Sequence, residues 1–172
     1  MQRAAELRDL LRAPEIKRSA TPLARVDEAG VFEGYASLFN VADLSRDVVA
    51  PGAFSASLRR RGAGGVKMLW QHDPTEPIGA WIWLREDLRG LAVRGRLNLA
   101  VARAREALAL MREGAVDGLS IGFRTERARA DSANGLRRLE KIDLWEISLV
   151  TFPMLPQARA ALVHNASPAR AP

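Results

Sequence analysis

The chain has 172 residues, of which 48% are hydrophobic, and a formal net charge of +6, a size and composition typical of one globular domain. It contains no cysteine, which excludes disulfides, cysteine nucleophiles and thiolate metal sites. No run of about 18 apolar residues occurs and residues 1–12 have no apolar core, so we expect neither a membrane span nor a signal peptide.

The first half of the chain alternates between turn residues and short apolar patterns. Leucines at helical spacing predict a short amphipathic helix in the N-terminal 13 residues, which Pro14 ends. Further along, we expect strands over residues 15–26, 31–39, 66–71, 77–85 and 91–99, a short helix over 53–61 and an irregular connection over 40–52. His72 continues the apolar face of the strand over residues 66–71, and Asp73-Pro74 is expected to break that strand.

The second half contains the most regular helix pattern, over residues 101–113, with Gly114 as its stop. We expect strands over residues 118–128, 136–141 and 142–152, a last short helix over 157–163 and a disordered tail. The predicted class is α+β: a mainly antiparallel sheet or β-barrel with two or three helices. The expected division is an N-terminal helical extension (1–13), the main domain (14–163) and the tail (164–172).

A serine lies at the centre of the strand over residues 118–123, where Leu119, Ile121 and Phe123 alternate with Gly118, Ser120 and Gly122. Ser120 is a candidate nucleophile, and the bare glycine face would leave room for a peptide substrate. An inert serine in a packed strand is the commoner outcome for such a pattern. The segment also matches Gly-x-Ser-x-Gly, but a helix precedes it and a strand follows it, which excludes the nucleophile elbow of α/β-hydrolases.

A serine nucleophile needs a base, and the base needs an orienting partner. Of the two histidines, His164 lies in the expected tail, which leaves His72 as the candidate base. Glu146 is a candidate partner on a half-apolar strand, with Asp143, Asp73 and Glu140 as alternatives. An ordinary ion pair between Glu146 and an arginine also fits the sequence. No histidine pair with metal-ligand spacing occurs, so we expect no metal and no cofactor.

Four segments, taken together and in this order, resemble the prohead serine proteases of tailed phages. They are Phe-Glu-Gly-Tyr-Ala at 32–36 with Asp-Val-Val-Ala-Pro-Gly-Ala-Phe at 47–54, Met-Leu-Trp-Gln-His-Asp at 68–73 with Pro-Ile-Gly at 77–79, Gly-Leu-Ser-Ile-Gly-Phe at 118–123, and Trp-Glu-Ile-Ser-Leu-Val-Thr-Phe-Pro at 145–153. The resemblance implies that His72 is the base, Ser120 the nucleophile and Glu146 the third catalytic residue. It also implies a central β-barrel ringed by helices, similar to herpesvirus assemblin.

By the same resemblance, the chain is expected to be a serine endopeptidase acting inside the immature procapsid in the bacterial host cytoplasm. Its substrates would be the scaffold or the N-terminal segment of the major capsid protein, with self-cleavage and self-association as further expectations. The chain is short for the family, which suggests a mature form, a compact prophage or a gene-transfer particle as its origin. An alternative interpretation is a non-catalytic capsid assembly or scaffold-binding module.

Arginine clusters such as residues 59–61 and 137–138 suggest an acidic partner, either nucleic acid or an acidic protein surface. Such clusters are more often simply solvated faces of a protein. Only 6% of residues are aromatic, and the four tryptophans lie in apolar strand patterns. Core packing of these rings is therefore favoured over stacking on nucleic-acid bases, and no membrane partner is expected.

Overall fold

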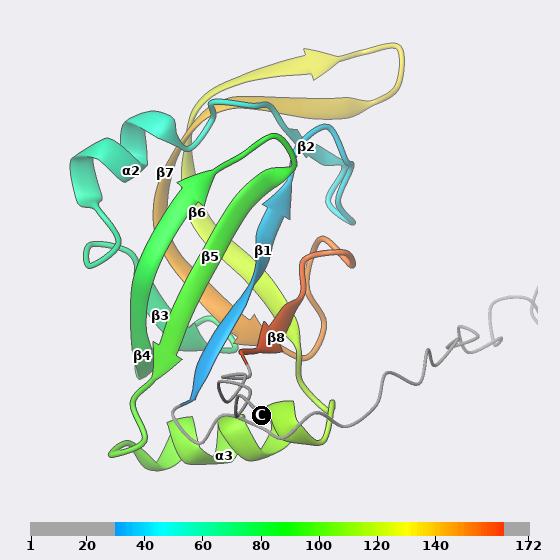
Figure 1. The fold of residues 1–172 in the computed structure, drawn as a ribbon. Helices are drawn as coiled ribbons and strands as arrows, with labels where there is room; N and C mark the ends of the chain where they lie inside the picture. Colours follow the sequence, from blue (N-terminus) through cyan, green and yellow to red (C-terminus); the bar gives the residue numbers. More distant parts are fainter. Residues whose placement is uncertain (1–29, 164–172) are drawn as a thin grey trace, which may run out of the picture.

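The structure is a computed structural model that describes residues 30–163. The expected N-terminal helix, the strand over residues 15–26 and the tail over 164–172 lie outside the described residues. Within them the chain forms eight strands and two helices (Figure 1). In chain order these are β1 (Val31–Leu38), β2 (Asp47–Val49), α2 (Ser55–Arg61), β3 (Lys67–Trp70), β4 (Asp73–Glu86), β5 (Gly90–Leu97), α3 (Ala102–Arg112), β6 (Gly118–Asp131), β7 (Leu136–Val150) and β8 (Ala160–Leu162).

The eight strands form one sheet in the order β2-β7-β3-β4-β5-β1-β8, and β6 pairs with β7. Pairing is antiparallel except for β2 and β3, which both run parallel to β7. The sheet curls until the residues before β8 reach the start of β6, where Gly118 and Arg159 form a bridge. The Leu119 N–H donates to the carbonyl of Ala158 at 2.9 Å beside that bridge. The predicted α+β class with a mainly antiparallel, barrel-like sheet is therefore confirmed.

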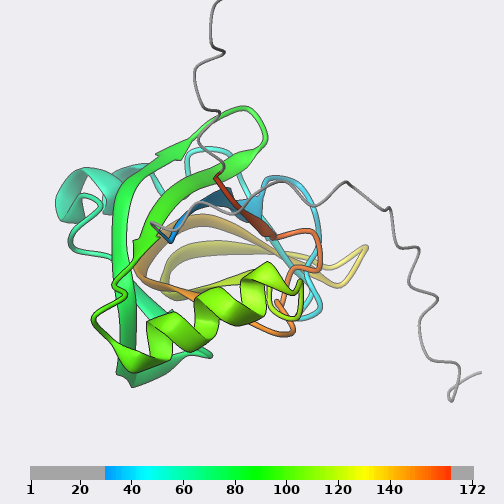
Figure 2. The same ribbon diagram turned by 60° about the horizontal axis from the view of Figure 1, so that its bottom comes forward.

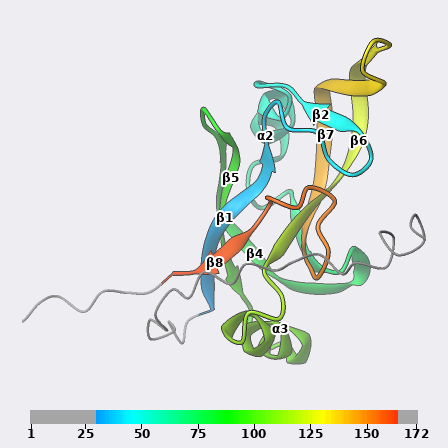
Figure 3. The same ribbon diagram turned by 90° about the vertical axis from the view of Figure 1, so that its right-hand side faces the viewer.

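The curled sheet places β1 and β5 across from β6 and β7 (Figure 3). Buried apolar side chains from these strands and from β4 form the core. Phe32 of β1 and Trp81 of β4 meet there edge to face, with ring centroids 5.7 Å apart. Helix α3 lies across one end of the sheet (Figure 2). Its Ala104, Leu108 and Met111 are buried, as the helical spacing predicted, so this helix closes the core at that end.

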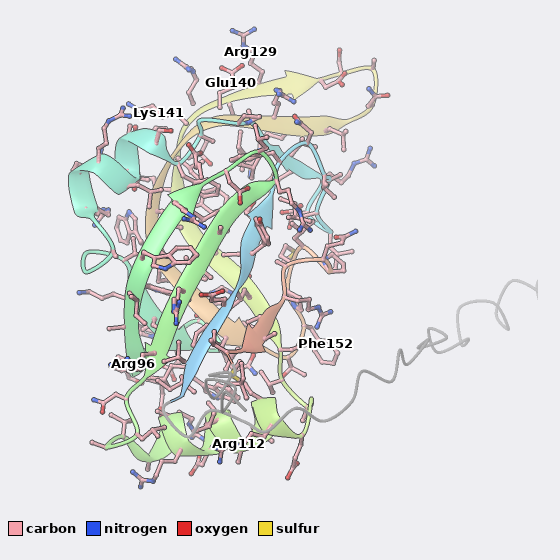
Figure 4. The ribbon with its side chains drawn as sticks, in the orientation of Figure 1. Arg96, Arg112, Arg129, Glu140, Lys141 and Phe152 are labelled. Carbon is pink, nitrogen blue, oxygen red and sulfur yellow. The ribbon has the colours of Figure 1, made fainter. Side chains whose placement is uncertain are left out.

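The end of β6 and the start of β7 extend beyond the barrel as a two-stranded hairpin that carries Arg129, Glu140 and Lys141 (Figure 4). Glu140 pairs there with Arg127 and Arg129. Arg46, in the connection before β2, donates from Nε to the carbonyl of Gly135 at the hairpin turn, at 2.9 Å. The connection over residues 40–52 is therefore attached to the hairpin.

The structure corrects the predicted strand and helix boundaries at four places. The connection over residues 40–52 contains the short strand β2, and the strand after His72 begins at Asp73 rather than at residue 77. The two strands expected over 136–141 and 142–152 are one strand, β7. The helix expected over 157–163 is wrong, because residues 160–162 form β8 and pair with β1. In each case pairing with another strand overrides the local pattern.

Trp145 corrects the expectation that the tryptophans pack in the core. In the ladder between β6 and β7, Gly122 pairs with Glu146 and Phe123 with Leu144, which leaves Trp145 as the extra residue of a β-bulge. Its side chain is 54% exposed, whereas Trp81 is buried. The bulge shifts the alternation of side chains along β7 immediately next to Glu146.

Candidate active site

Ser120 lies near the start of β6, directly opposite Ser148 of β7. Two residues along, Gly122 of β6 lies opposite Glu146 of β7. Directly paired residues of an antiparallel ladder project to the same face of the sheet, with Cβ atoms about 5 Å apart. The register therefore places Ser120, Ser148 and Glu146 on one face of two neighbouring strands.

His72 lies in the tight turn between β3 and β4, next to the same part of β7. Strand β3 runs parallel to β7, with Trp70 paired to Leu149. The chain then turns sharply through Gln71 and His72, whose φ angles of 51° and 62° are in the left-handed region. Residues other than glycine are uncommon there, and two in succession need firm anchoring. The turn carries the imidazole back over β7 toward Glu146.

The imidazole and the carboxylate form a direct hydrogen bond. His72 Nδ1 lies 2.6 Å from Glu146 Oε1, and the other carboxylate oxygen, Oε2, accepts from Ser148 Oγ at 2.7 Å. Both carboxylate oxygens are therefore engaged, and the Glu146 side chain is only 12% exposed. Because the His72 ring uses Nδ1 to contact Glu146, its Nε2 is left for other partners.

The pKa of His72 is raised above its ordinary value of about 6.5. The main cause is the hydrogen bond to Glu146, and the negative charge of the carboxylate adds to it, while partial burial of the ring opposes the rise. A protonated imidazole is thus stabilised beside Glu146. This is the electrostatic arrangement expected for a base that accepts a proton during a reaction.

His72 and Ser120 line the same cavity, which has a volume of about 280 Å³. Its wall continues along β6 through Ile121 and Phe123 and reaches Met154 beyond the end of β7. Ser120 is 7% exposed, so its hydroxyl lies in the wall rather than on an open surface. Within residues 30–163, the hydrogen bonds of His72 go to Glu146 and Ser148, and none joins its ring to Ser120.

The structure distinguishes Glu146 from the other acidic candidates. Asp143 receives hydrogen bonds from Arg61, at 2.9 and 2.8 Å, and its pKa is held well below the usual range by that guanidinium. Glu140 pairs with arginines of the hairpin, and Asp73 accepts from Thr75. Glu146 contacts the histidine instead of an arginine. His164, the second histidine, lies outside the described residues.

The glycines beside Ser120 make room for the protein itself, which corrects the interpretation that their bare face admits a substrate. A Cβ on Gly122 would lie 2.7 Å from Glu146 Cδ and overlap Oε1. A Cβ on Gly118 would lie 2.6 Å from the carbonyl oxygen of Val150 and 2.7 Å from the ring of Pro153. The glycine at 122 is therefore required by the position of the carboxylate.

Two residues of the site were not recognised from the sequence as part of it, Gln71 and Ser148. The Ser148 hydroxyl contacts both Glu146 and the backbone of His72. Its one sequence signal was its position two residues after Glu146, on the same face of a strand. Among residues 30–163, no group of three or more His, Asp or Glu side chains could hold a metal ion, and no helix is long and apolar enough to cross a membrane.

A carboxylate-bound histidine and a serine lining one cavity of a curled β-sheet form the kind of site found in serine hydrolases. Comparison with known proteins defines the family. Residues 17–170 match the family described as caudovirus prohead serine protease, and the chain belongs to that family. It is 40% identical over 138 residues to the prohead protease of Enterobacteria phage HK97, and 31% identical over 86 residues to that of Escherichia phage T5.

These alignments cover 79% and 50% of this chain but only 61% and 40% of the HK97 and T5 proteins, so the chain spans about three fifths or less of the relatives it matches. Solved structures that share the fold include two viral proteases. A KSHV protease in complex with a hexapeptide phosphonate inhibitor superimposes with a TM-score of 0.57 at 13% identity, over 78% of this chain and 65% of that one. The capsid assembly protease of bacteriophage T4 superimposes with a TM-score of 0.54 at 14% identity, over 70% of this chain and 81% of the T4 protein.

Proposed function

We propose that this chain is a serine endopeptidase that cleaves scaffold protein, or the N-terminal segment of the major capsid protein, inside the immature procapsid in the bacterial host cytoplasm. The observation that carries the proposal is the hydrogen bond between His72 and Glu146 beside the cavity that Ser120 lines. The relatives in phages HK97 and T5 are both named prohead proteases, which supports the choice of substrate class.

In this mechanism Ser120 Oγ attacks the carbonyl carbon of the scissile peptide bond. His72 Nε2 takes the hydroxyl proton and then gives it to the leaving amine, so that an acyl-enzyme ester forms as the C–N bond breaks. Water then attacks the ester with the same histidine as base, which restores the serine. Glu146 fixes the imidazole through Nδ1 and stabilises its positive charge while it holds the extra proton.

The mechanism needs a hydrogen bond between Ser120 and the ring of His72, and this bond is expected to form when substrate binds. Catalytic hydrogen bonds are often long in enzymes without substrate and tighten in the reactive complex. The ring of His72 is 44% exposed and lines the cavity, so a bound peptide can contact it. A peptide lying in the cavity along β6 would exclude water from the histidine and the serine together.

The direct test is co-expression of the full chain with the scaffold and major capsid genes of its own source. Mass spectrometry of the capsid protein is expected to show a new N-terminus and loss of the scaffold. Capsid and scaffold that stay full length while particles assemble normally would contradict the proposal and support the non-catalytic assembly module.

Replacing Glu146 with glutamine is expected to lower kcat by about 10⁴-fold, because an amide can hold the imidazole in the wrong tautomer. The pKa of His72 should also fall, since the hydrogen bond to a carboxylate that raises it is lost. The base must be neutral to act, so wild-type kcat/KM rises with pH through a pKa above about 6.5, and this limb moves to lower pH in the variant. NMR titration of His72 measures the shift, and an unchanged pKa would contradict the pairing.

Replacing Gly122 with alanine is expected to reduce kcat by about 100-fold, because the new methyl group displaces the Glu146 carboxylate from His72. Gly64→Ala is the matched control, since a Cβ there meets nothing within 4 Å and the backbone of Gly64 is not left-handed. The comparison is made with purified variants whose melting temperatures have been recorded. Equal kcat in the two variants would show that Gly122 is not needed for the position of Glu146.

A further inference from the structure

Building on the proposed function, we propose that Ser148 is a positioning residue that fixes His72 and Glu146 relative to one another through a single hydroxyl group. Ser148 is fully buried in β7, directly opposite Ser120. It does not line the cavity, so its role is not contact with substrate. Its hydroxyl contacts the backbone of the histidine and the side chain of the glutamate, which are the two groups that must stay in register.

The two hydrogen bonds use the hydroxyl in opposite senses. The backbone N–H of His72 donates to Ser148 Oγ at 3.0 Å, and Ser148 Oγ donates its own proton to Glu146 Oε2 at 2.7 Å. A serine hydroxyl has one proton and two lone pairs, so both bonds form at once. The third bond joins His72 Nδ1 to Glu146 Oε1. The three bonds form a closed loop that runs from the His72 backbone through the Ser148 hydroxyl and the Glu146 carboxylate to the His72 ring.

The position of Ser148 also explains how the strained turn is held. The Gln71 N–H donates to the carbonyl of Leu149 at 3.0 Å, continuing the ladder between β3 and β7. At His72 the chain has turned away, and the Ser148 side chain supplies the acceptor. The Gln71 side chain adds a further contact, donating from Nε2 to Thr151 Oγ1 at 2.8 Å. Consecutive left-handed residues persist only when neighbouring groups hold them this closely.

The charges around the pair are consistent with this role. Glu146 faces His72 and Ser148, and the nearby Asp143 of the same strand is bound by Arg60 and Arg61 on α2. No arginine or lysine within residues 30–163 forms an ion pair with Glu146. The orientation of the carboxylate therefore depends on the histidine and on the serine hydroxyl.

The test compares Ser148→Ala with Ser57→Ala, a matched variant elsewhere in the fold. Ser57 of α2 is also fully buried, and its hydroxyl accepts from the Leu144 N–H at 2.9 Å and donates to Asp143 Oδ1 at 3.2 Å. Each variant thus removes a hydroxyl that joins a backbone N–H to a carboxylate. We expect similar losses in melting temperature, but a fall in kcat of about 100-fold with unchanged KM for Ser148→Ala alone. Equal kcat in the two variants would overturn the proposal.

Amide hydrogen exchange provides a second measurement that needs no activity. In Ser148→Ala the His72 amide is expected to lose its protection, while the Gln71 amide, bonded to Leu149, keeps it. Equal protection of the His72 amide in the wild type and the variant would overturn the positioning role. If the wild type cleaves nothing but the exchange result holds, the proposed function fails and the positioning of the histidine stands.

A second substitution covers the case in which Ser148→Ala does not fold. Ser148→Cys is close to serine in shape, but its thiol is a weak donor and acceptor. It is expected to fold and to show the same loss of kcat and of His72 amide protection. Wild-type kcat and protection in Ser148→Cys would show that packing, rather than the two hydrogen bonds, is what Ser148 contributes.

Discussion

Replacing Ser120 with alanine is expected to leave a folded protein that no longer processes its substrate, with kcat reduced by about 10⁶-fold. The loss is this large because the acyl-enzyme route requires the hydroxyl oxygen, and no other side chain can supply it from the same position. The substitution removes one oxygen atom from a nearly buried side chain that makes no hydrogen bond to His72 in the structure. Stability is therefore expected to change little.

The measurement for Ser120→Ala is the fraction of capsid protein with a mature N-terminus after co-expression, together with thermal unfolding of the purified variant. Ser57 of α2 offers a control, since it is also buried but does not line the cavity. Ser57→Ala should process the capsid protein like the wild type. Normal processing by Ser120→Ala would remove Ser120 from the mechanism.

Replacing His72 with asparagine is expected to abolish processing to a similar extent, about 10⁶-fold in kcat, because the serine loses its base. Asparagine is chosen because it tolerates the left-handed backbone that His72 adopts, with φ of 62°. It also keeps the backbone N–H that donates to Ser148. The turn should therefore persist, and the loss can be attributed to the imidazole.

Gln71→Asn is the control for His72→Asn, because it places asparagine at the adjoining left-handed position, with φ of 51°. It shortens the side chain that contacts Thr151 but leaves the imidazole in place. Kinetics at saturating substrate should show a much larger loss of kcat for His72→Asn. If the two variants lost the same activity, the turn, and not the base, would be the origin of the effect.

The parts of the fold that could be predicted from the sequence are those in which a local period is long and unbroken. Helix α3 was predicted because its apolar residues recur at helical spacing over three turns. The serine-bearing strand was predicted because large and small residues alternate from Gly118 to Phe123. The strands expected over residues 77–85 and 91–99 correspond to most of β4 and β5, which pair with one another.

The parts that could not be predicted depend on contacts between distant segments. Strands β2 and β8 have three residues each, too few for any period, and they exist because β7 and β1 supply partners. β7 was predicted as two strands because bulges at Trp145 and Glu140 shift its alternation. The left-handed backbone of His72 left no signal either, since it depends on acceptors supplied by Ser148 and Leu149.

The candidate site residues were named from the sequence, and their catalytic roles stay a prediction, whereas their geometry could not be predicted. His72 was proposed as the one histidine outside the expected tail and Ser120 from its strand pattern, whereas Glu146 was preferred to the other acidic candidates only through the family resemblance. The structure brings His72 and Glu146 into contact. The sequence suggested that Gly122 leaves room for a substrate, but in the structure it leaves room for the Glu146 side chain. The strand register decides which side chain lies opposite a glycine, and here it is Glu146. Registers between β6 and β7 could not be derived from one sequence.

The central claim is that His72 activates Ser120, and covalent labelling with a fluorophosphonate tests it most directly. Such a reagent reacts with serines whose hydroxyl is deprotonated by a neighbouring base. We expect mass spectrometry to find the label on Ser120 in the wild type and no label in His72→Asn. An unlabelled wild-type protein, or equal labelling of Ser120 in both proteins, would contradict the account.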